Sequence, residues 1–396
     1  MNRVYLDAAT SAPLAPAARG AMVAALEVTG DPLAIHEAGR AAREVLDRAR
    51  GDIAHAIGAE ADEIVFTSGG TGSVALSITG MALGRRGDGN RLVTSAVEHP
   101  AVLSAVERLN ASGFEVVRIG VDADGRVDLD RFATEIRRPG TTLASIQHAN
   151  HETGTLQQIG EAARLARAEG VPFHTDAAQT VGHLPIDVDA LSVGSLSLSA
   201  RKFGGPPGVG ALYVRRGIDV VATLRGDDRE GRRRAGAPNV AAIAGMAAAL
   251  RSADDGLADE AARAWTLTAA LRDELAEAVD GLTVHGHPTH RVPHIVCFSV
   301  EGLDPATLAM ALDDRGFDVG AGSIVNGRPD VASPVLTAMG VSPRPSFRIG
   351  VGRGTSPEQL TSFVETLRRT VADLRRVHGS AAATMSRFRP PEDERG

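Results

Sequence analysis

The feature that most constrains the fold is a regular alternation of short apolar runs with helical stretches between residues 62 and 175. A strand that is followed by a helix and then by another strand returns parallel to the first one. The order therefore predicts an α/β fold built on a largely parallel sheet. The predicted strands are 62–67, 92–95, 114–119, 142–148 and 172–175, and the predicted helices between them are 71–83, 100–109, 129–137 and 159–168.

Two charged residues mark the end of this alternating region. Asp176 follows the strand at 172–175, and Lys202 follows a further apolar strand at 193–198. A glycine-rich turn and a third strand at 209–214 come directly after the lysine. The separation of 202 − 176 = 26 residues leaves room for a connecting segment and a return strand. Both side chains can therefore lie at adjacent strand ends and face one ligand.

A lysine and an acid in this arrangement suit pyridoxal 5'-phosphate (PLP). A lysine amine forms a Schiff base with the cofactor aldehyde, and a carboxylate beside the pyridine nitrogen keeps the ring protonated as an electron sink. The pair alone is weak evidence, because an Asp and a Lys at such a spacing arise by chance in most proteins. The residues around them decide the matter.

The surroundings of the pair resemble the cysteine desulfurases and their relatives in the class V aminotransferase group. The matching residues are His174, Asp176, Gln179, Ser199 and Lys202, followed by the glycine-rich stretch 204–213. The resemblance extends from about residue 5 to residue 377. It implies the PLP-dependent transferase fold type I, in which a large domain with a mainly parallel seven-stranded sheet carries a smaller α+β domain. It also implies a homodimer with active sites at the interface.

The expected domain boundaries follow from the resemblance and from local composition. We expect residues 13–250 to form the large PLP-binding domain, and residues 1–12 and 251–378 to form the small domain. The tail at 379–396 is rich in small and charged residues and contains two prolines, a composition typical of a disordered end.

A phosphate site is expected at TSGGTGS, residues 67–73, which connects a strand to a helix. Backbone amides near Gly70, the Thr71 hydroxyl and the positive end of the helix dipole suit an anion. A glycine turn alone is weak evidence. The family resemblance assigns the phosphate role here and gives Ser199 a second phosphate contact.

The resemblance assigns three further residues. His99 would stack on the pyridine ring and relay protons as a catalytic residue beside Lys202, and Gln179 would hydrogen-bond the phenolic oxygen. Arg348, in SFRIGVGR, would bind the substrate α-carboxylate, because a guanidinium can bind a carboxylate with two hydrogen bonds. Arg353 is a nearby alternative for this role.

The chain departs from the desulfurase pattern at four positions. Val325 stands where the family has its nucleophilic cysteine, so no persulfide can form by the family's mechanism. Arg201 replaces the usual histidine before the lysine, and His151 stands where an asparagine usually approaches the cofactor. We expect Arg201 and His151 to contact the cofactor and to alter its chemistry. Ala237 replaces a threonine that contacts the phosphate across the subunit interface.

Composition excludes several classes of function. A net charge of −7 argues against a general nucleic-acid surface, and no apolar run approaches the about 18 residues needed to cross a bilayer. The first residues lack the apolar core of a signal peptide, which favours the cytoplasm. Cys297, the single cysteine, lies in a strand-like apolar run and is interpreted as a core residue. The histidines at 285, 287, 290 and 294 lack cysteine or carboxylate partners, so no metal site is expected.

These residues predict a PLP enzyme that acts on an amino acid. Our first hypothesis is a C–S lyase, in which Lys202 removes the α-proton of an S-substituted cysteine and the thiol leaves by β-elimination. An aminotransferase or a decarboxylation-linked deaminase is the alternative, and Arg201 or His151 would direct that choice. A PLP-binding scaffold without turnover is a third possibility, and the presence of Lys202, Asp176, His99 and Arg348 together argues against it.

Overall fold

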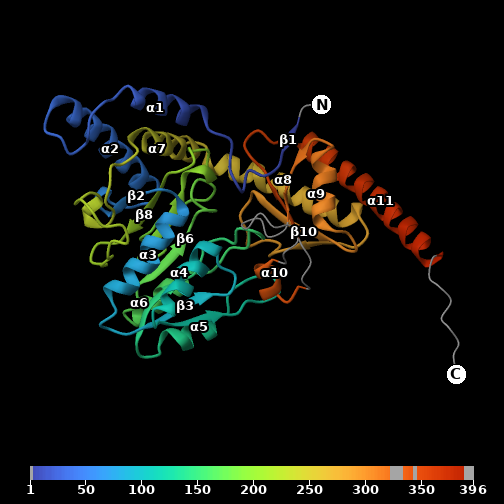
Figure 1. Ribbon diagram of the computed structural model, residues 1–396, viewed down its shortest axis with the longest axis horizontal. Helices are drawn as coiled ribbons and strands as arrows, with labels where there is room; N and C mark the ends of the chain where they lie inside the picture. The colour runs from blue at the N-terminus through green and yellow to red at the C-terminus, as the bar shows by residue number, and fades with distance from the viewer. Residues whose placement is uncertain (1–2, 322–332, 342–345, 388–396) are drawn as a thin grey trace.

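The computed structural model describes residues 3–321, 333–341 and 346–387 and contains two main sheets (Figure 1). The larger sheet has seven strands in the order β2-β8-β7-β6-β5-β3-β4. All neighbours run parallel except β8, which is antiparallel to both β2 and β7. The predicted mainly parallel seven-stranded sheet is therefore confirmed. Its strands are β2 (Ile64–Thr67), β3 (Arg91–Ser95), β4 (Glu115–Ile119), β5 (Thr141–Ser145), β6 (Phe173–Asp176), β7 (Ser195–Ser199) and β8 (Gly210–Val214).

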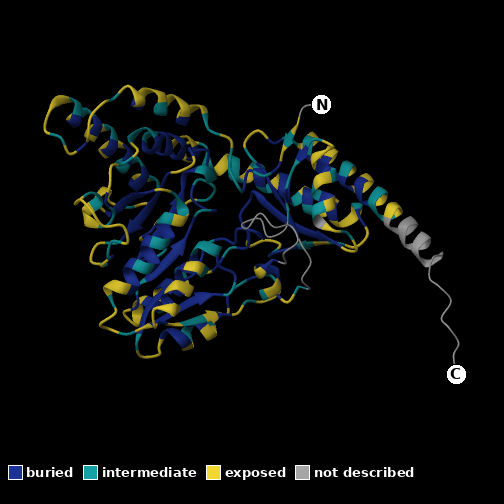
Figure 2. Ribbon diagram, viewed as in Figure 1, coloured by how far each residue is buried: buried dark blue, intermediate teal, exposed yellow. Residues whose placement is uncertain are grey.

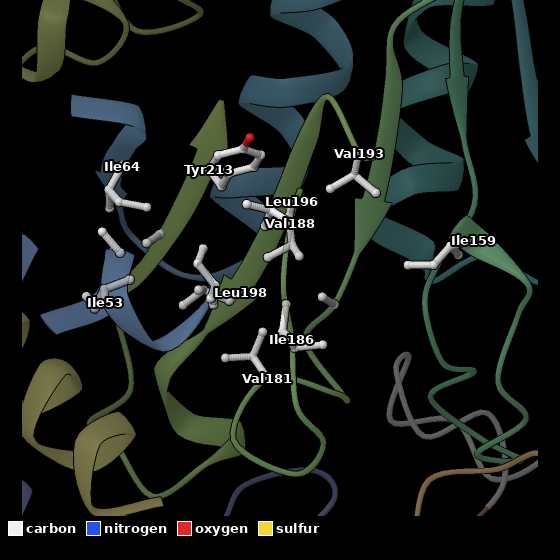
Figure 3. Packing of buried hydrophobic residues seen from close by; sticks show 14 of the residues in the cluster. Ile53, Ile64, Ile159, Val181, Ile186, Val188, Val193, Leu196, Leu198 and Tyr213 are labelled. Carbon is white, nitrogen blue, oxygen red and sulfur yellow. The ribbon is translucent and has the colours of Figure 1, made fainter. Parts of the chain in front are cut away.

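Helices cover both faces of this sheet, because its strands are apolar on both sides. In β2, Ile64 and Phe66 pack into the core shared with α2, α5, α6 and α7, while Val65 packs into the core formed with α3 and α4. Figure 3 shows the first of these cores around Leu196 and Tyr213. The helices are α1 (Pro16–Leu26), α2 (Glu37–Ala56), α3 (Gly70–Gly84), α4 (Pro100–Ala111), α5 (Leu129–Ile136), α6 (Ile159–Ala168) and α7 (Val240–Asp254), with 3-10 turns η1 (Ala61–Glu63), η2 (Ala200–Lys202) and η3 (Glu230–Arg232).

The second sheet is antiparallel, with four strands in the order β12-β13-β10-β9. It packs against α8, α9 and α11 around a separate apolar core. Figure 2 shows the buried strands of both sheets enclosed by helices with exposed outer faces. The elements are α8 (Leu257–Ala278), β9 (Leu282–His285), β10 (Ile295–Val300), α9 (Pro305–Asp313), β11 (Phe317–Asp318), β12 (Gly320–Ala321), α10 (Pro334–Ala338), β13 (Phe347–Gly350) and α11 (Pro357–Arg387).

The N-terminal segment connects the two parts of the molecule. Strand β1 (Val4–Tyr5) pairs in parallel with β11, and Asp7 bridges to Gly350 at the end of β13. The backbone N–H of Ala12 then donates to the carbonyl of Arg201, beside the larger sheet. We propose on these contacts that residues 1–12 belong with 251–378 in the small domain and that 13–250 form the large one.

The last described helix extends into the tail of the chain. Helix α11 continues to Arg387, so part of the predicted disordered tail from residue 379 has a helical backbone. No proline or glycine lies between 380 and 387 to end the helix, whereas Pro390 and Pro391 follow it. In the described part of the chain, no helix is long and apolar enough to cross a membrane.

Candidate active site

A cavity of about 400 Å³ lies at the C-terminal ends of the parallel strands, where ligands of open α/β sheets bind. Asp176 is the last residue of β6 and Ser199 is the last residue of β7, while His99 follows β3. The structure brings most of the predicted cofactor residues together here. The predicted residues that line the cavity are Gly70, Thr71, His99, His151, Asp176, Gln179, Ser199, Arg201 and Lys202.

One end of the cavity suits a phosphate. Gly69 has φ +133°, a conformation that favours glycine, and the chain then enters α3 at Gly70. A Cβ on Gly70 would lie 3.1 Å from the Cβ of Ser199, so a side chain there would crowd the turn. The free N–H groups at the start of α3, together with the Thr71 and Ser199 hydroxyls, would hold the phosphate of PLP.

Asp176 lies at another side of the same cavity. Its Oδ1 accepts a hydrogen bond of 3.0 Å from the backbone N–H of Ala178. Burial raises the pKa of this carboxyl to about 6, against the hydrogen bond from Ala178 and the charge of Lys202. A bound pyridinium nitrogen would supply the positive partner that favours the ionised carboxylate.

Lys202 lies in η2 and points at the N-terminal segment. Its Nζ donates to the carbonyl oxygens of Ala9, at 2.7 Å, and Thr10, at 3.1 Å. Burial lowers the pKa of this amine well below its usual value, and the charges of Arg348 and Arg201 lower it further. A neutral amine is the form that can bond to an aldehyde or accept a proton.

His99 is the N-cap residue of α4. Its Nδ1 accepts a hydrogen bond of 3.1 Å from the backbone N–H of Ala101, which assigns the ring proton to Nε2. Burial, followed by the charges of Lys202 and Arg201, lowers the pKa of the imidazole to about 4. The ring is therefore neutral at physiological pH and suits stacking on a pyridine ring.

Gln179 has a partner that the sequence did not predict. Its Nε2 donates to the Ala9 carbonyl at 3.1 Å, and its Oε1 lies 3.4 Å from Nε2 of His294. His294 in turn stacks on His183, with ring centroids 3.8 Å apart. The sequence does not predict this pairing, because His294 lies 115 residues after Gln179. A histidine before a buried strand was the only signal for it.

Arg348 lies in β13 and reaches the same region. Its guanidinium donates to the His151 carbonyl at 2.6 Å and pairs with Asp7 at 3.0 Å and with the Thr10 hydroxyl. A substrate carboxylate would have to share this guanidinium with Asp7. Arg353 instead donates to the carbonyl of Ala253 and lines a second cavity.

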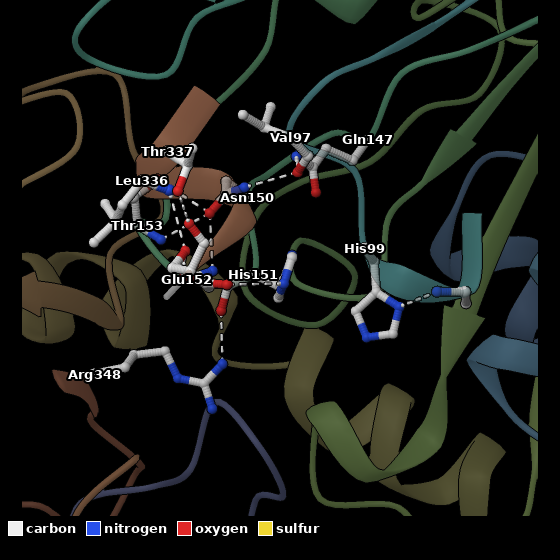
Figure 4. A network of polar contacts seen from close by, with 12 residues as sticks. Val97, His99, Gln147, Asn150, His151, Glu152, Thr153, Leu336, Thr337 and Arg348 are labelled. Atoms are coloured by element: carbon white, nitrogen blue, oxygen red, sulfur yellow. Dashed lines mark hydrogen bonds and ion pairs between the residues drawn. The ribbon is translucent and has the colours of Figure 1, made fainter. Parts of the chain in front are cut away.

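Figure 4 shows the polar contacts around Asn150, His151 and Glu152, together with Arg348 and His99. The His151 ring meets the His99 ring edge-on, with centroids 4.9 Å apart and planes at 73°. Nε2 of His151 lies 3.7 Å from a carboxyl oxygen of Glu152, and the other oxygen accepts 2.5 Å from the Ser333 hydroxyl. Neither Glu152 nor Ser333 was predicted as a site residue, because neither residue belongs to a recognisable sequence motif.

The thiol of the chain lies away from this cavity. Cys297 is fully buried in β10, and burial raises the pKa of its thiol to about 12. Position 325, where Val325 replaces the family's cysteine, lies outside the described residues. Ala237 is exposed on the surface of the chain.

The other clustered histidines make ordinary contacts. His285, buried at the end of β9, lies 2.8 Å from the Ser299 hydroxyl, and His287 packs against His290. Among residues 3–321, 333–341 and 346–387, no three His, Cys, Asp or Glu side chains form a metal-binding group.

Comparison with known proteins identifies the family. The model of the aminotransferase class-V family matches residues 4–363. The chain belongs to this family. The class-V aminotransferases, including their cysteine desulfurase members, use PLP, and the cavity described above has the phosphate turn, the buried acid and the buried lysine that this cofactor needs.

Individual relatives of this chain are named cysteine desulfurases. It is 39% identical to cysteine desulfurase IscS of Dictyoglomus turgidum, over 95% of this chain and 96% of the relative. A solved NifS-like protein superposes with a TM-score of 0.88 at 28% identity, covering 94% of this chain and all of that one. The apo cysteine desulfurase from Thermococcus onnurineus NA1 gives a TM-score of 0.85 at 26% identity, covering 94% of this chain and 95% of that one. The chain is thus an enzyme of the PLP-dependent, cysteine desulfurase-like group.

Proposed function

We propose that this protein is a PLP-dependent C–S lyase that cleaves S-substituted cysteines by β-elimination without a persulfide. The observation that carries the proposal is the state of its only thiol. Cys297 is fully buried and its pKa is raised to about 12, so it is neither accessible nor ionised at neutral pH. With Val325 at the family's cysteine position, the chain has no thiol that could accept sulfur from a substrate.

Each residue of the cavity would have one task in this reaction. When bound, PLP supplies an aldehyde that holds the substrate amino group and a ring that withdraws electrons from Cα. The start of α3 and Ser199 would hold the phosphate, and Asp176 would keep the ring nitrogen protonated. Gln179 would hydrogen-bond the phenolic oxygen, and Arg348 would orient the α-carboxylate.

Lys202 would act as the base. Its lowered pKa leaves the amine neutral, so Nζ can accept the α-proton of the substrate. The electron pair left at Cα then expels the sulfur substituent on Cβ. Hydrolysis of the three-carbon remainder gives pyruvate and ammonia. None of these steps requires a cysteine from the enzyme.

The test is release of pyruvate and thiol from a panel of S-substituted cysteines, with free L-cysteine as the comparison substrate. We expect release from conjugates in the wild type and none in Lys202→Ala. If no conjugate gives pyruvate or thiol while added amino acids still change the absorbance of the bound cofactor, the lyase is wrong. Transamination or decarboxylation would then be measured through keto acid or CO₂. An absorbance that no amino acid changes would indicate a scaffold without turnover.

A further inference from the structure

A buried histidine that lines the cavity, His151, is followed in the sequence by a buried carboxylate, Glu152, and Arg348 contacts the histidine backbone. His151 is 5% exposed and Glu152 is 2% exposed, and the ring of His151 lines the cavity with Lys202. Nε2 of His151 lies 3.7 Å from a carboxyl oxygen of Glu152. Catalytic hydrogen bonds are often this long before a substrate binds and shorten in the complex.

Side chains from three segments of the chain hold His151 and Glu152 in place. Arg348 donates to the carbonyl of His151, and the side chain of Asn150 accepts from the N–H groups of Glu152, at 2.9 Å, and Thr153, at 2.8 Å. Ser333, at the start of α10, donates to the second carboxyl oxygen of Glu152. Contacts from Asn150, from the start of α10 and from β13 therefore hold the pair in place. Figure 4 shows Asn150 and Arg348 around the pair.

The pair can hold one exchangeable proton. Burial lowers the pKa of His151 well below its usual value, and His99, Arg348 and Lys202, the charged or titratable groups around it, act in the same direction. Burial raises the pKa of Glu152 to about 7, although the hydrogen bond from Ser333 and the charge of Arg348 oppose this rise. The charge of Glu152 also raises the pKa of the nearby Cys297 thiol.

The second ring nitrogen of His151, Nδ1, makes no hydrogen bond within the described structure. This nitrogen is also buried. A buried polar atom left this way costs about 1–3 kcal/mol unless a ligand satisfies it. A neutral imidazole can take a proton at one nitrogen and release the proton on the other, so His151 can pass a proton from Glu152 at Nε2 to a ligand atom that meets Nδ1.

We propose that His151 is a catalytic acid–base residue that gives a proton to the departing sulfur, with Glu152 as its proton source. This inference rests on the C–S lyase function proposed above. Lys202 takes the α-proton, the Cβ–S bond breaks with its electron pair on sulfur, and sulfur takes the proton from Nδ1 of His151. Glu152 restores a proton at Nε2. Water then carries the proton held by Lys202 to Nδ1 while Nε2 gives its proton back to Glu152, so the starting state is restored and the sequence needs no oxidant or reductant.

A series of leaving groups tests this role. S-Ethylcysteine releases a weakly acidic thiol that needs a proton, whereas S-(4-nitrophenyl)cysteine releases a much more acidic one. In the PLP-loaded enzyme, His151→Asn should lower kcat/KM for the ethyl substrate by roughly 100-fold and for the nitrophenyl substrate by less than roughly 10-fold. His290→Asn, at an exposed histidine, is the matched control and should change neither.

Equal losses for both substrates in His151→Asn would overturn the proposal and leave the lyase intact, since a positioning role slows both alike. Absence of thiol from every conjugate would overturn both proposals. A change confined to the ethyl substrate supports the assignment.

A second measurement does not depend on turnover. The ¹⁵N resonances of the His151 ring in the PLP-loaded protein should remain those of a neutral imidazole from about pH 5.5 to about pH 8.5. The proton should nevertheless shift between the two nitrogens near pH 7, where Glu152 ionises. Glu152→Gln should abolish this shift, and Ser333→Ala should move its midpoint to higher pH because a hydrogen bond to the carboxylate is lost. Resonances that do not change, or that change equally in Glu152→Gln, would contradict the proposal.

Discussion

Burial at single residues sets the protonation of several acids around the cavity. Glu98 is 1% exposed, and one of its carboxyl oxygens accepts from the Ser95 hydroxyl at 2.6 Å and from the N–H of Gln147 at 2.9 Å. Its other oxygen has no partner among the described residues. Desolvation raises the pKa of this carboxyl to about 8, so the acid is mostly protonated at neutral pH.

Glu98 should make the cofactor-free protein less stable as the pH rises. A folded-state pKa above the unfolded value of 4.5 stabilises the fold at low pH, and this contribution is lost as the pH rises from about 4.5 through about 8. Glu98→Gln keeps an acceptor and removes the charge. The free energy of unfolding of the variant minus that of wild type should therefore grow with pH, by on the order of 1 kcal/mol or more between pH 6 and pH 8.5. Urea titrations measure it, and a constant difference would contradict the assignment.

Arg348 should control substrate affinity. Lysine keeps the charge but cannot form the two-pronged contact, so Arg348→Lys should raise KM for amino acid substrates by roughly 10- to 100-fold. Arg353→Lys is the matched control, because that side chain lines the second cavity and should change KM little. Steady-state kinetics with the best conjugate would measure these KM values. A larger rise in the Arg353 variant would indicate that Arg353 binds the substrate carboxylate instead.

The sequence predicted the residues that carry a motif and missed those that act through contacts. Asp176, Ser199 and Lys202 end strands or follow them, so periodicity and motif order placed them in one cavity. Thr10 and Ser333 are ordinary residue types whose roles arise only when distant segments meet. No local pattern marks such residues, because chain topology creates their contacts.

At the scale of elements, the larger sheet was predictable and the smaller one only in part. The predicted strands at 193–198 and 209–214 correspond to β7 and β8 within two residues, since their apolar runs are bounded by glycine and turns. The strand-like apolar run that contains Cys297 corresponds to β10. Strands β11 and β12 have two residues each, which is too short for a periodic signal, and they are defined only by their partners.

One close approach between elements should matter for the phosphate turn. A Cβ on Gly210, the first residue of β8, would lie 2.6 Å from the carbonyl oxygen of Leu198 and 2.8 Å from the backbone of Gly69. Gly210→Ala must therefore displace the turn before α3. We expect PLP affinity to fall by roughly 10-fold or more and stability to fall by about 1–3 kcal/mol. Gly87→Ala, at an exposed glycine with open space around it, should change neither in fluorescence binding and thermal unfolding.

At the scale of the whole molecule, we propose a homodimer, as the family resemblance implies. A group of apolar side chains is exposed on α1 and the turn after it. Exposed apolar surface can mark an interaction site, and we place the proposed dimer contact here. Their exposed fractions are Val23 58%, Leu26 69%, Leu33 56% and Ile35 89%.

Ile35→Arg should weaken the dimer. A charge placed in an apolar interface cannot be paired there, so the dissociation constant should rise by at least about 10-fold. Sedimentation velocity over a range of concentrations would measure it. Met310→Arg, at a residue 70% exposed on α9, is the control and should leave the dimer unchanged. A wild type that sediments as a monomer at all concentrations would contradict the proposal.

The N-terminal segment also influences Lys202, the proposed base. The same stretch that pairs with β11 and bridges to Gly350 places the carbonyls of Ala9 and Thr10 on the amine of Lys202. A hinge movement of the smaller sheet would pull on these carbonyls, and the proton affinity of the amine would change with the number of oxygens around it. Any displacement of this short length of chain would therefore change the strength of the base.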